Sequence, residues 1–385
     1  MQNERRLLTS LIVGLAVACG GGADDLLEPQ PAEPQPAEPP PPVGDDGSGP
    51  AADTPPEPPE QLCALTGPPV PSMGDVLVYE DTFSGSAVDP LKWTVSTGYR
   101  GHPPILNTTE PDNAIVDQGL LSIVTEHSRA DPSYPYVSGY LDSLGKFART
   151  YGRIEFRARF PHVPGVWFAI WGRPWSRPFP EIDIEVLNSV NVNRSQLYFV
   201  NHWAAPPLPA AIRRTFALVD DLDLSQFHDY TIDWKPESLE WRIDGKTRLQ
   251  ADSRGIPKLP VYWIVNGWVG GWSGSPPDDS PLPTSFEVDS MKVYRVDGLV
   301  ADPKVFVPRA RPTYPRTRVL DVAVANFDEV CAHVSMYDDD ALVRTTSTPP
   351  YRFALARLLP GAHTLRFVAT DGVRTAETTL PVTIE

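Results

Sequence analysis

The chain contains little cysteine and few basic residues. Three cysteines among 385 residues cannot form the dense disulfide framework of a small secreted scaffold. Lysine and arginine total 33 against 49 aspartates and glutamates, which gives a net charge of −16. Such a chain has no strongly basic surface for a phosphate backbone, so we expect no nucleic acid among its partners. The same balance disfavours a polysulfated substrate.

Several common catalytic motifs are absent as well. The sequence has no G-x-S-x-G elbow of the serine hydrolases, no glycine-rich phosphate loop and no zinc-type spacing among its seven histidines. Long amphipathic helix patterns are not apparent either. Any chemistry must therefore come from other side chains, carried on strands or loops.

The first residues have the pattern of an export signal. Two arginines precede an apolar stretch, residues 7–18, which is too short to span a bilayer. Small residues end this stretch directly before Cys19, as in bacterial lipoproteins, which the segment resembles. We expect residues 1–18 to be removed and Cys19 to be lipidated, placing the protein at the cell surface or in the periplasm. The alternative is a secreted protein with an incidental cysteine.

A tether is predicted for residues 19–62. Residues 20–62 carry ten acidic and no basic side chains, and prolines recur throughout this segment. Such a composition buries no core and keeps the chain extended. We expect the protein to meet a membrane only through the lipid. Cys63 and Cys331 then remain; export permits a disulfide between them, and two unpaired thiols are the alternative.

The region 63–297 predicts an all-β domain. All ten tryptophans lie between Trp93 and Trp272, which indicates a compact, aromatic-rich domain. The stretch "RIEFRARF" alternates apolar with charged residues, the period-two pattern of a half-buried strand. Many such short runs, separated by turns, are typical of a β-sandwich or barrel.

A linker and a second small domain are expected after the first one. Residues 298–315 are rich in proline and arginine, so we expect few contacts across this linker. Residues 316–385 again show short strand patterns and resemble bacterial immunoglobulin-like modules. The sequence therefore predicts an independent C-terminal β-sandwich without a catalytic residue.

The stretch "PEIDIEVLNS" carries three acids at alternate positions. On a strand Glu181, Asp183 and Glu185 share one face, and the aliphatic residues between them share the other. Crowding carboxyls raises the pKa of at least one of them. This cost has a use where one carboxyl must stay protonated as a general acid while another stays ionised. A solvated strand face and a calcium site are the alternatives.

Aromatic residues stand directly before the three acids. Trp167, Trp171, Trp175 and Phe179 precede them in "GVWFAIWGRPWSRPF". Aromatic faces stack on sugar rings, so these residues beside paired acids favour a polysaccharide as the substrate. We expect Trp167 and Trp171 to belong to the core.

Together with several other segments, the acidic motif resembles glycoside hydrolase family 16. "EIDIE" matches the family's E-x-D-x-E signature, and six other segments occur in the family's order: "VYEDTFSG", "NAIVDQGLLSI", "YGRIEFRARF", "GVWFAIW", "FHDYTIDWKPESLEWRIDGK" and "VNGWVGGW", followed by "VDSMKVY". The resemblance implies an antiparallel two-sheet jelly roll with a substrate cleft. It also implies retaining endo-hydrolysis of a β-glycan.

The resemblance assigns roles to particular residues. Glu181 matches the nucleophile, Glu185 the general acid/base and Asp183 the assisting aspartate between them. No cofactor is implied for the chemistry, although a structural calcium ion is implied at Asp289 and the backbone of Gly119. The substrate-binding residues expected from the resemblance and from the aromatic stretch are Glu155, Trp175, Phe179 (where tryptophan is usual), His202, Asn266 and Trp268.

The substrate signals are divided. "VNGWVGGW" and the pair His202-Trp203 resemble the β-1,3-glucanase branch, whereas the unbulged acid motif resembles the mixed-linkage glucanases. We expect a neutral β-1,3- or β-1,3-1,4-glucan and a monomeric enzyme. A transglycosylase and a galactan hydrolase on the same fold are alternatives. A non-catalytic carbohydrate-binding surface lipoprotein is the alternative from another class.

Overall fold

The structure is a computed structural model that describes most of the chain after residue 73. The described residues are 74–98, 105–128, 130–175, 180–205, 211–251, 255–276, 281–327 and 332–385. The expected signal peptide, the tether, the three cysteines and Phe179 therefore lie outside the described residues. No helix in the described part is both long and apolar enough to cross a membrane.

The first domain is built from seventeen strands, and its described part has only two short 3-10 helices beside them. These helices are Pro111–Asn113 and Gly271–Ser273. The strands are β1 (Val76–Asp81), β2 (Thr94–Val95), β3 (Asn107–Thr109), β4 (Ala114–Asp117), β5 (Leu120–His127), β6 (Tyr136–Ser138), β7 (Tyr140–Asp142), β8 (Gly152–Arg159), β9 (Val166–Pro174), β10 (Glu181–Leu187), β11 (Gln196–Ala205), β12 (Ala211–Val219), β13 (His228–Lys235), β14 (Ser238–Ile243), β15 (Lys246–Ala251), β16 (Val261–Val269) and β17 (Thr284–Arg295).

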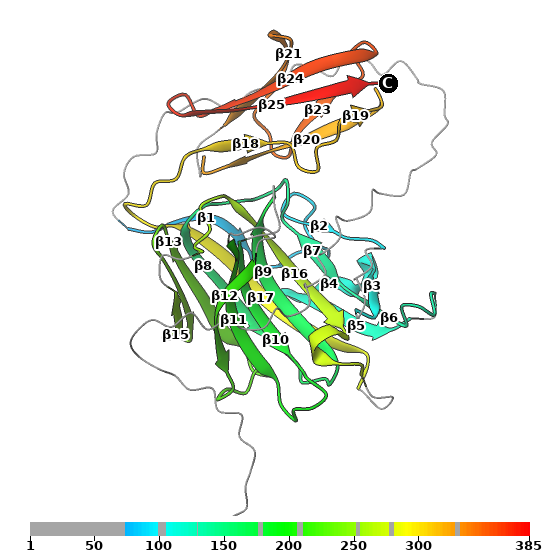
Figure 1. Cartoon of the computed structure of the whole chain (residues 1–385), viewed down its shortest axis with the longest axis vertical. Helices are drawn as coiled ribbons and strands as arrows, with labels where there is room; N and C mark the ends of the chain where they lie inside the picture. Colours follow the sequence, from blue (N-terminus) through cyan, green and yellow to red (C-terminus); the bar gives the residue numbers. More distant parts are fainter. Residues whose placement is uncertain are drawn as a thin grey trace, which may run out of the picture. The chain divides into compact units, whose positions relative to one another are not determined.

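These strands form two sheets. The seven-stranded sheet has the order β12-β11-β10-β9-β16-β7-β2, and its strands β9 to β12 lie side by side in green in Figure 1. The ten-stranded sheet has the order β15-β14-β13-β8-β17-β5-β6-β3, with β1 also paired to β17 and β4 to β5. All pairs in both sheets are antiparallel except β3 with β6. The expected all-β, two-sheet fold is confirmed.

The core lies between the inner faces of the two sheets. Phe156 of β8 meets Trp263 of β16 edge to face, with ring centroids 5.5 Å apart. Phe286 of β17 likewise meets Phe168 of β9 at 5.5 Å. Because alternate residues of a strand point to opposite faces, packing these side chains inward sends their neighbours outward. On the seven-stranded sheet, that outer face carries the acids of β10.

The C-terminal module also consists of two sheets. The three-stranded sheet has the order β18-β20-β23 and the five-stranded sheet has the order β19-β25-β24-β21-β22. Two of these strands, β18 and β19, lie within 298–315, where the sequence predicted a linker. The strands are β18 (Lys304–Phe306), β19 (Thr313–Tyr314), β20 (Val319–Ala325), β21 (His333–Asp338), β22 (Ala341–Thr346), β23 (Tyr351–Ala354), β24 (Gly361–Thr370) and β25 (Thr375–Ile384).

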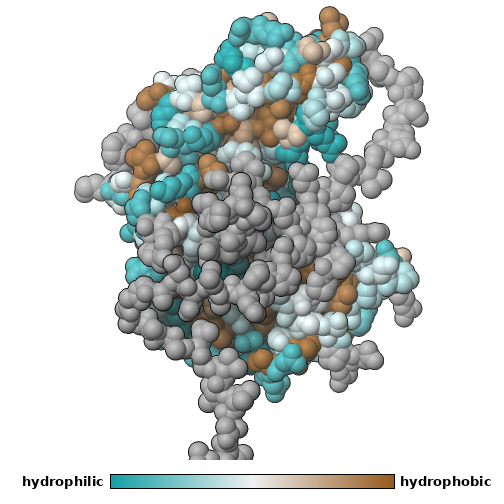
Figure 2. All heavy atoms as spheres, viewed as in Figure 1, coloured by the Kyte–Doolittle hydropathy of each residue, from teal (hydrophilic) through white to brown (hydrophobic). Residues whose placement is uncertain are grey.

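The expectation that few contacts cross the linker is wrong. Phe306, Ala323 and Ala325 form one buried apolar cluster with Tyr262 and Ile264 of β16. The proline and arginine in 298–315 suggested a linker. The strand β18 within it forms by pairing with β20, which the local sequence pattern does not show. On the face drawn in Figure 2, the described surface is mixed, with hydrophobic residues scattered among hydrophilic ones.

Candidate active site

The three acids of the E-x-D-x-E motif share the outer face of β10. Ile182, Ile184 and Val186 are completely buried in the core. Their neighbours Glu181 and Glu185 are half-buried, and Asp183 between them is 1% exposed. The aliphatic residues therefore orient the acids, because a register slip by one residue would place the carboxyls in the core.

Neighbouring strands place specific side chains beside each acid. Antiparallel pairing sets Glu181 opposite His202 of β11, and Asp183 opposite Trp171 of β9. Glu185 pairs with Ala169 of β9, whose other neighbour is Asn266 of β16. Directly opposite residues are close enough for their side chains to meet. Two of the expected substrate-binding residues, His202 and Asn266, therefore lie on the same face as the acids.

Asp183 is a buried carboxyl between two others. Burial raises its pKa well above the ordinary range, and the charges of Glu181 and Glu185 raise the pKa further. Neither of its oxygens has a hydrogen-bond partner among the described residues. An ionised carboxylate without such partners would be strongly disfavoured there. Burial therefore favours the protonated, neutral form of Asp183.

His202 is also held neutral. Its Nε2 lies 3.6 Å from Asp183 Oδ2, which is too long for a hydrogen bond, and the side chain is 5% exposed. Burial, assisted by the charge of Arg214, lowers the pKa of His202 to about 4. Burial thus favours the neutral form of both partners in the contact between His202 and Asp183.

Glu181, Asp183 and His202 form the one potential metal-binding group found in the described part of the chain. One ligand atom each from Glu181, Asp183 and His202 lies within 4.8 Å of the other two. A protonated carboxyl is a poor metal ligand, because metals bind the deprotonated form. Protonation of Asp183 and binding of a metal ion would therefore compete at this group.

Buried polar atoms without partners gather on this face. Trp171 Nε1 donates a hydrogen bond to Asn266 Oδ1 at 2.8 Å. The amide nitrogen of Asn266 has no partner, and neither do Trp167 Nε1 and His202 Nδ1, among the described residues. Unpaired buried polar atoms are rare in folded proteins and call for an explanation. Sugar hydroxyls, which both donate and accept, are suited to such groups.

Aromatic rings extend the face beyond Glu185. Trp167 of β9 pairs with Trp268 of β16, their ring centroids 6.2 Å apart. Trp272 follows in the second 3-10 helix, 5.5 Å from Trp167 and 51% exposed. Tyr140 of β7 lies 6.1 Å from Trp268 on its other side. These four rings form what we call the aromatic platform: Tyr140, Trp167, Trp268 and Trp272.

The platform corrects one expectation and adds residues that the sequence did not single out. Trp167 and Trp171 are not core residues, because β9 turns Phe168 and Ile170 inward. For Trp272, the only indication in the sequence of a role at the site was its place in "VNGWVGGW". The stacking of Trp272 on Trp167 depends on the fold of the loop after β16.

Glu155 does not belong to this site. It lies on β8 of the ten-stranded sheet, between the buried core residues Ile154 and Phe156. Its side chain therefore lies on the outer face of the other sheet, where it hydrogen-bonds Tyr294. The expected sugar-binding role of Glu155 at this site is wrong, since its own strand alternation turns it away from the site.

Trp175, which was expected to bind substrate, contacts the C-terminal module instead. Its ring stacks on Phe306 with centroids 3.7 Å apart and planes 9° from parallel. One face of the indole is thereby used within the protein. The apolar surroundings of Trp171 and Trp175 come in part from the other domain.

The two residues expected at a calcium ion lie near each other. Pairing of β17 with β5 ends at Val288 opposite Leu121, so Asp289 and Gly119 both lie just beyond the same end. The carboxylate of Asp289 lies 3.9 Å from Arg157 and accepts a hydrogen bond from Ser290. Gly119 has φ +79°, which suits the turn between β4 and β5. The calcium ion remains a prediction.

Two arginines lie on the row of Glu181. Arg173 follows the pair Gly172–Ile182 by one residue, which brings it beside Glu181 on the outer face. Arg214 of β12 pairs with His202. The sequence showed no basic cluster, because these arginines are far apart along the chain. They place positive charge next to the acids.

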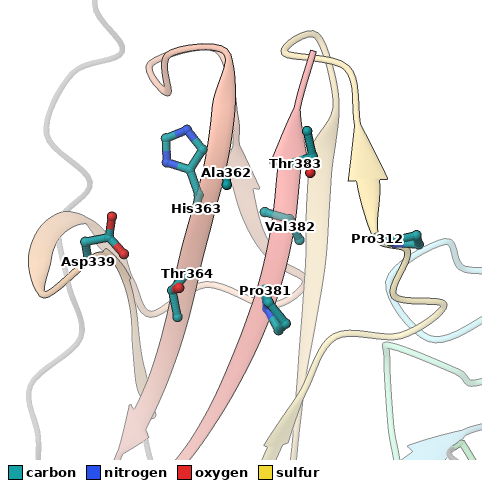
Figure 3. A pocket seen from close by; sticks show the side chains of 8 residues that line it. All are labelled: Pro312, Asp339, Ala362, His363, Thr364, Pro381, Val382 and Thr383. Carbon is teal, nitrogen blue, oxygen red and sulfur yellow. The ribbon is translucent and has the colours of Figure 1, made fainter.

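A separate hollow lies on the C-terminal module. Figure 3 shows His363 and Thr364 of β24 beside Val382 and Thr383 of β25. Both ring nitrogens of His363 are already used, Nδ1 with Asp338 and Nε2 with the carbonyl of Leu359. No phenyl or indole ring lines the hollow. It therefore lacks the stacking surface that the first domain provides.

Comparison with known proteins agrees with this geometry. The family model "Glycosyl hydrolases family 16" matches residues 105–288. A beta-glucanase of Rhodothermus marinus is 30% identical over 243 residues, which cover 57% of this chain and 85% of that protein. Glucan endo-1,3-beta-glucosidase A1 of Niallia circulans is 28% identical over 60% of this chain, and the match spans 39% of that relative's length.

The solved structures give the same result. The laminarinase from Rhodothermus marinus superimposes with a TM-score of 0.51 at 29% identity, covering 58% of this chain and 99% of that one. The catalytic domain of an endo-1,3-beta-glucanase from Thermotoga petrophila also has a TM-score of 0.51, at 26% identity. The signature acids, the two-sheet fold and these matches agree, and the chain belongs to glycosyl hydrolases family 16.

Proposed function

We propose that the chain is an endo-acting hydrolase of a β-1,3- or β-1,3-1,4-glucan that retains the anomeric configuration. One observation carries the proposal: the buried Asp183 lies between two half-buried glutamates on the outer face of β10, and burial raises its pKa. A solvated strand face would leave all three acids exposed and ionised. A site for acid and nucleophilic catalysis requires neighbouring carboxyls in different protonation states.

In the first step Glu181 acts as the nucleophile. Its carboxylate oxygen bonds to the anomeric carbon while the bond from that carbon to the glycosidic oxygen breaks. Glu185 gives its proton to the departing oxygen, so the released sugar leaves with a hydroxyl group. Burial favours the protonated form of Asp183, and a protonated Asp183 adds no negative charge beside Glu181, which favours the ionised nucleophile.

In the second step Glu185 reverses its role. Its carboxylate takes a proton from water, and the water oxygen bonds to the anomeric carbon as the bond to Glu181 breaks. Two inversions at one carbon give net retention. If a sugar hydroxyl replaces water, the same residues carry out transglycosylation.

The choice of β-glucan is supported by the aromatic platform and by the relatives. The platform offers uncharged ring faces to sugar rings. The names of the relatives from Niallia circulans and Rhodothermus marinus refer to glucans. Arg173 and Arg214 give one specific reason to test a sulfated galactan as the second candidate, since both place positive charge on the row of Glu181.

The proposal is tested by digestion of a panel of polysaccharides. Purified protein is incubated with laminarin, lichenan, xyloglucan, agarose and carrageenan, and the products are sized and assigned by anomer. We expect oligosaccharides from laminarin or lichenan, released as the retained anomer, and none from a Glu181→Gln control. Inverted products would overturn the mechanism, and cleavage of carrageenan alone would establish the galactan alternative. Binding of a glucan without cleavage would indicate a carbohydrate-binding protein.

A further inference from the structure

The C-terminal module covers part of the face that carries the catalytic acids. Phe306, Ala323 and Ala325 of the module pack with Tyr262 and Ile264 of β16. Both β16 residues lie on the outer face of the seven-stranded sheet, since Trp263 between them and Val261 before them are in the core. On β16, Ile264 is two residues from Asn266, which lies on the row of Glu185.

Polar contacts hold the module in this position. The buried backbone N–H of Thr150 donates to Asn326 Oδ1 at 2.9 Å. The amide nitrogen of Asn326 in turn donates to the hydroxyl of Thr150 at 3.3 Å and to the carbonyl of Asp302 at 2.8 Å. If the module were released, these groups would have to bond to water instead. The contact therefore includes specific hydrogen bonds in addition to apolar packing.

Charge and close approach add to the contact. Arg309 Nη2 lies 3.3 Å from Asp142 Oδ2, and Asp142 is buried at the end of β7. Gly145 allows Pro308 to approach closely, because an added Cβ there would lie 3.3 Å from the Pro308 ring. Apolar, hydrogen-bonded and charged groups therefore join the two domains over one continuous region.

We propose that the module closes one side of the substrate-binding face and limits how many sugar units can bind there. This inference rests on the proposed function of the same site. On the side away from the module, Trp272 is half exposed. On the side of Tyr262 and Trp175 the face is filled by Phe306 and its neighbours. A glycan bound at the acids extends along the aromatic platform and stops at the module.

The link to the acids runs through one residue. Trp171 belongs to the apolar cluster with the module, and its Cα pairs with that of Asp183. The indole of Trp171 also donates the hydrogen bond that orients Asn266. The boundary set by the module is therefore one side chain away from Asp183, which lies between the two glutamates.

A double variant, Phe306→Ala with Asn326→Gly, tests the inference in the full-length chain. Phe306 belongs to the interdomain cluster and not to the module's own core, and Asn326 has φ +63°, which glycine adopts readily. Small-angle X-ray scattering should give a larger radius of gyration when the module is released. The exposed Leu359 of the module, changed to Ala, is the matched control.

We expect the released module to change which substrates bind. Products from the polymer should lengthen by about one sugar or more, and KM for the longest oligosaccharide should fall about threefold or more. The kcat/KM for the shortest substrate should stay within about twofold of the native value, because the acids are untouched. The Leu359→Ala control should match the native chain in every measurement.

Two results would overturn the inference alone. The first is a larger radius of gyration in the double variant with unchanged product lengths and KM values, where the native chain cleaves glucan. The second is a rise in KM for long oligosaccharides, which would mean that the module binds substrate instead of limiting it. A native chain that cleaves no polysaccharide would overturn the proposed function together with this inference.

Discussion

Asp183 Oδ2 lies 3.6 Å from His202 Nε2, and both side chains are almost completely buried. Burial favours the neutral form of each group, so it raises the pKa of the acid and lowers that of the base. Both shifts disfavour an ion pair between these two side chains beside Glu181. Burying these two groups lowers the free energy of unfolding, and this effect can be measured.

Replacing Asp183 with asparagine should stabilise the protein and slow the reaction. A carboxyl with a raised folded-state pKa contributes most stability below its unfolded pKa and loses that contribution as pH rises. Asp183→Asn should therefore raise Tm at pH 7, and the gain should shrink toward pH 4. The same change removes an exchangeable proton beside Glu181, so kcat should fall about 100-fold. Thermal unfolding against pH, with steady-state kinetics, measures both effects. A variant that is less stable at pH 7 would contradict the neutral state of Asp183.

His202 should make the protein sensitive to acid. A histidine with a folded-state pKa of about 4 binds fewer protons when folded than when unfolded between pH 4 and about 6.5. Stability is therefore lost as pH falls through this window, by up to roughly 3 kcal/mol. His202→Gln should flatten that part of the Tm profile.

The roles of the two glutamates can be separated by azide rescue. In Glu181→Ala, added azide takes the place of the nucleophile and should give a glycosyl azide of inverted configuration. In Glu185→Ala, azide attacks the glycosyl-enzyme and should give the retained configuration. Proton NMR of the products distinguishes the two. The reverse pairing would exchange the assignments.

Trp272 should contribute binding but not chemistry. Its ring is half exposed and tilts against Trp167 at 5.5 Å. Loss of one aromatic contact worth about 1 kcal/mol raises KM roughly fivefold. We expect this rise in Trp272→Ala with kcat unchanged, whereas Trp272→Phe should retain most of the affinity. A fall in kcat with constant KM would contradict a pure binding role.

Lipidation of Cys19 is proposed from the sequence alone. Labelled palmitate should enter the native chain during expression in a bacterial host, because the cysteine follows an apolar segment that ends in small residues. Cys19→Ser should not be labelled and should appear in the soluble fraction. Equal labelling of both proteins would rule out the anchor.

The sequence by itself determined the catalytic face. Alternation of acids and aliphatics over "EIDIEV" allows one arrangement in which Ile182 and Ile184 are buried, and it places the three carboxyls together. It also determined the all-β fold, because apolar residues at every second position, interrupted by frequent turns, do not form one apolar face on a helix. These features are local, and they depend only on which side chains must leave water.

Tertiary structure decided everything that depends on pairing between distant strands. Alternation around Glu155 is as regular as that around Glu181, yet β8 belongs to the other sheet and turns Glu155 away. His202, Asn266 and Trp272 reach the site through strand register and loop geometry, which local patterns do not encode. The same holds for the contact of Phe306 with Trp175. A sequence shows which residues share a face, but long-range pairing determines what that face meets.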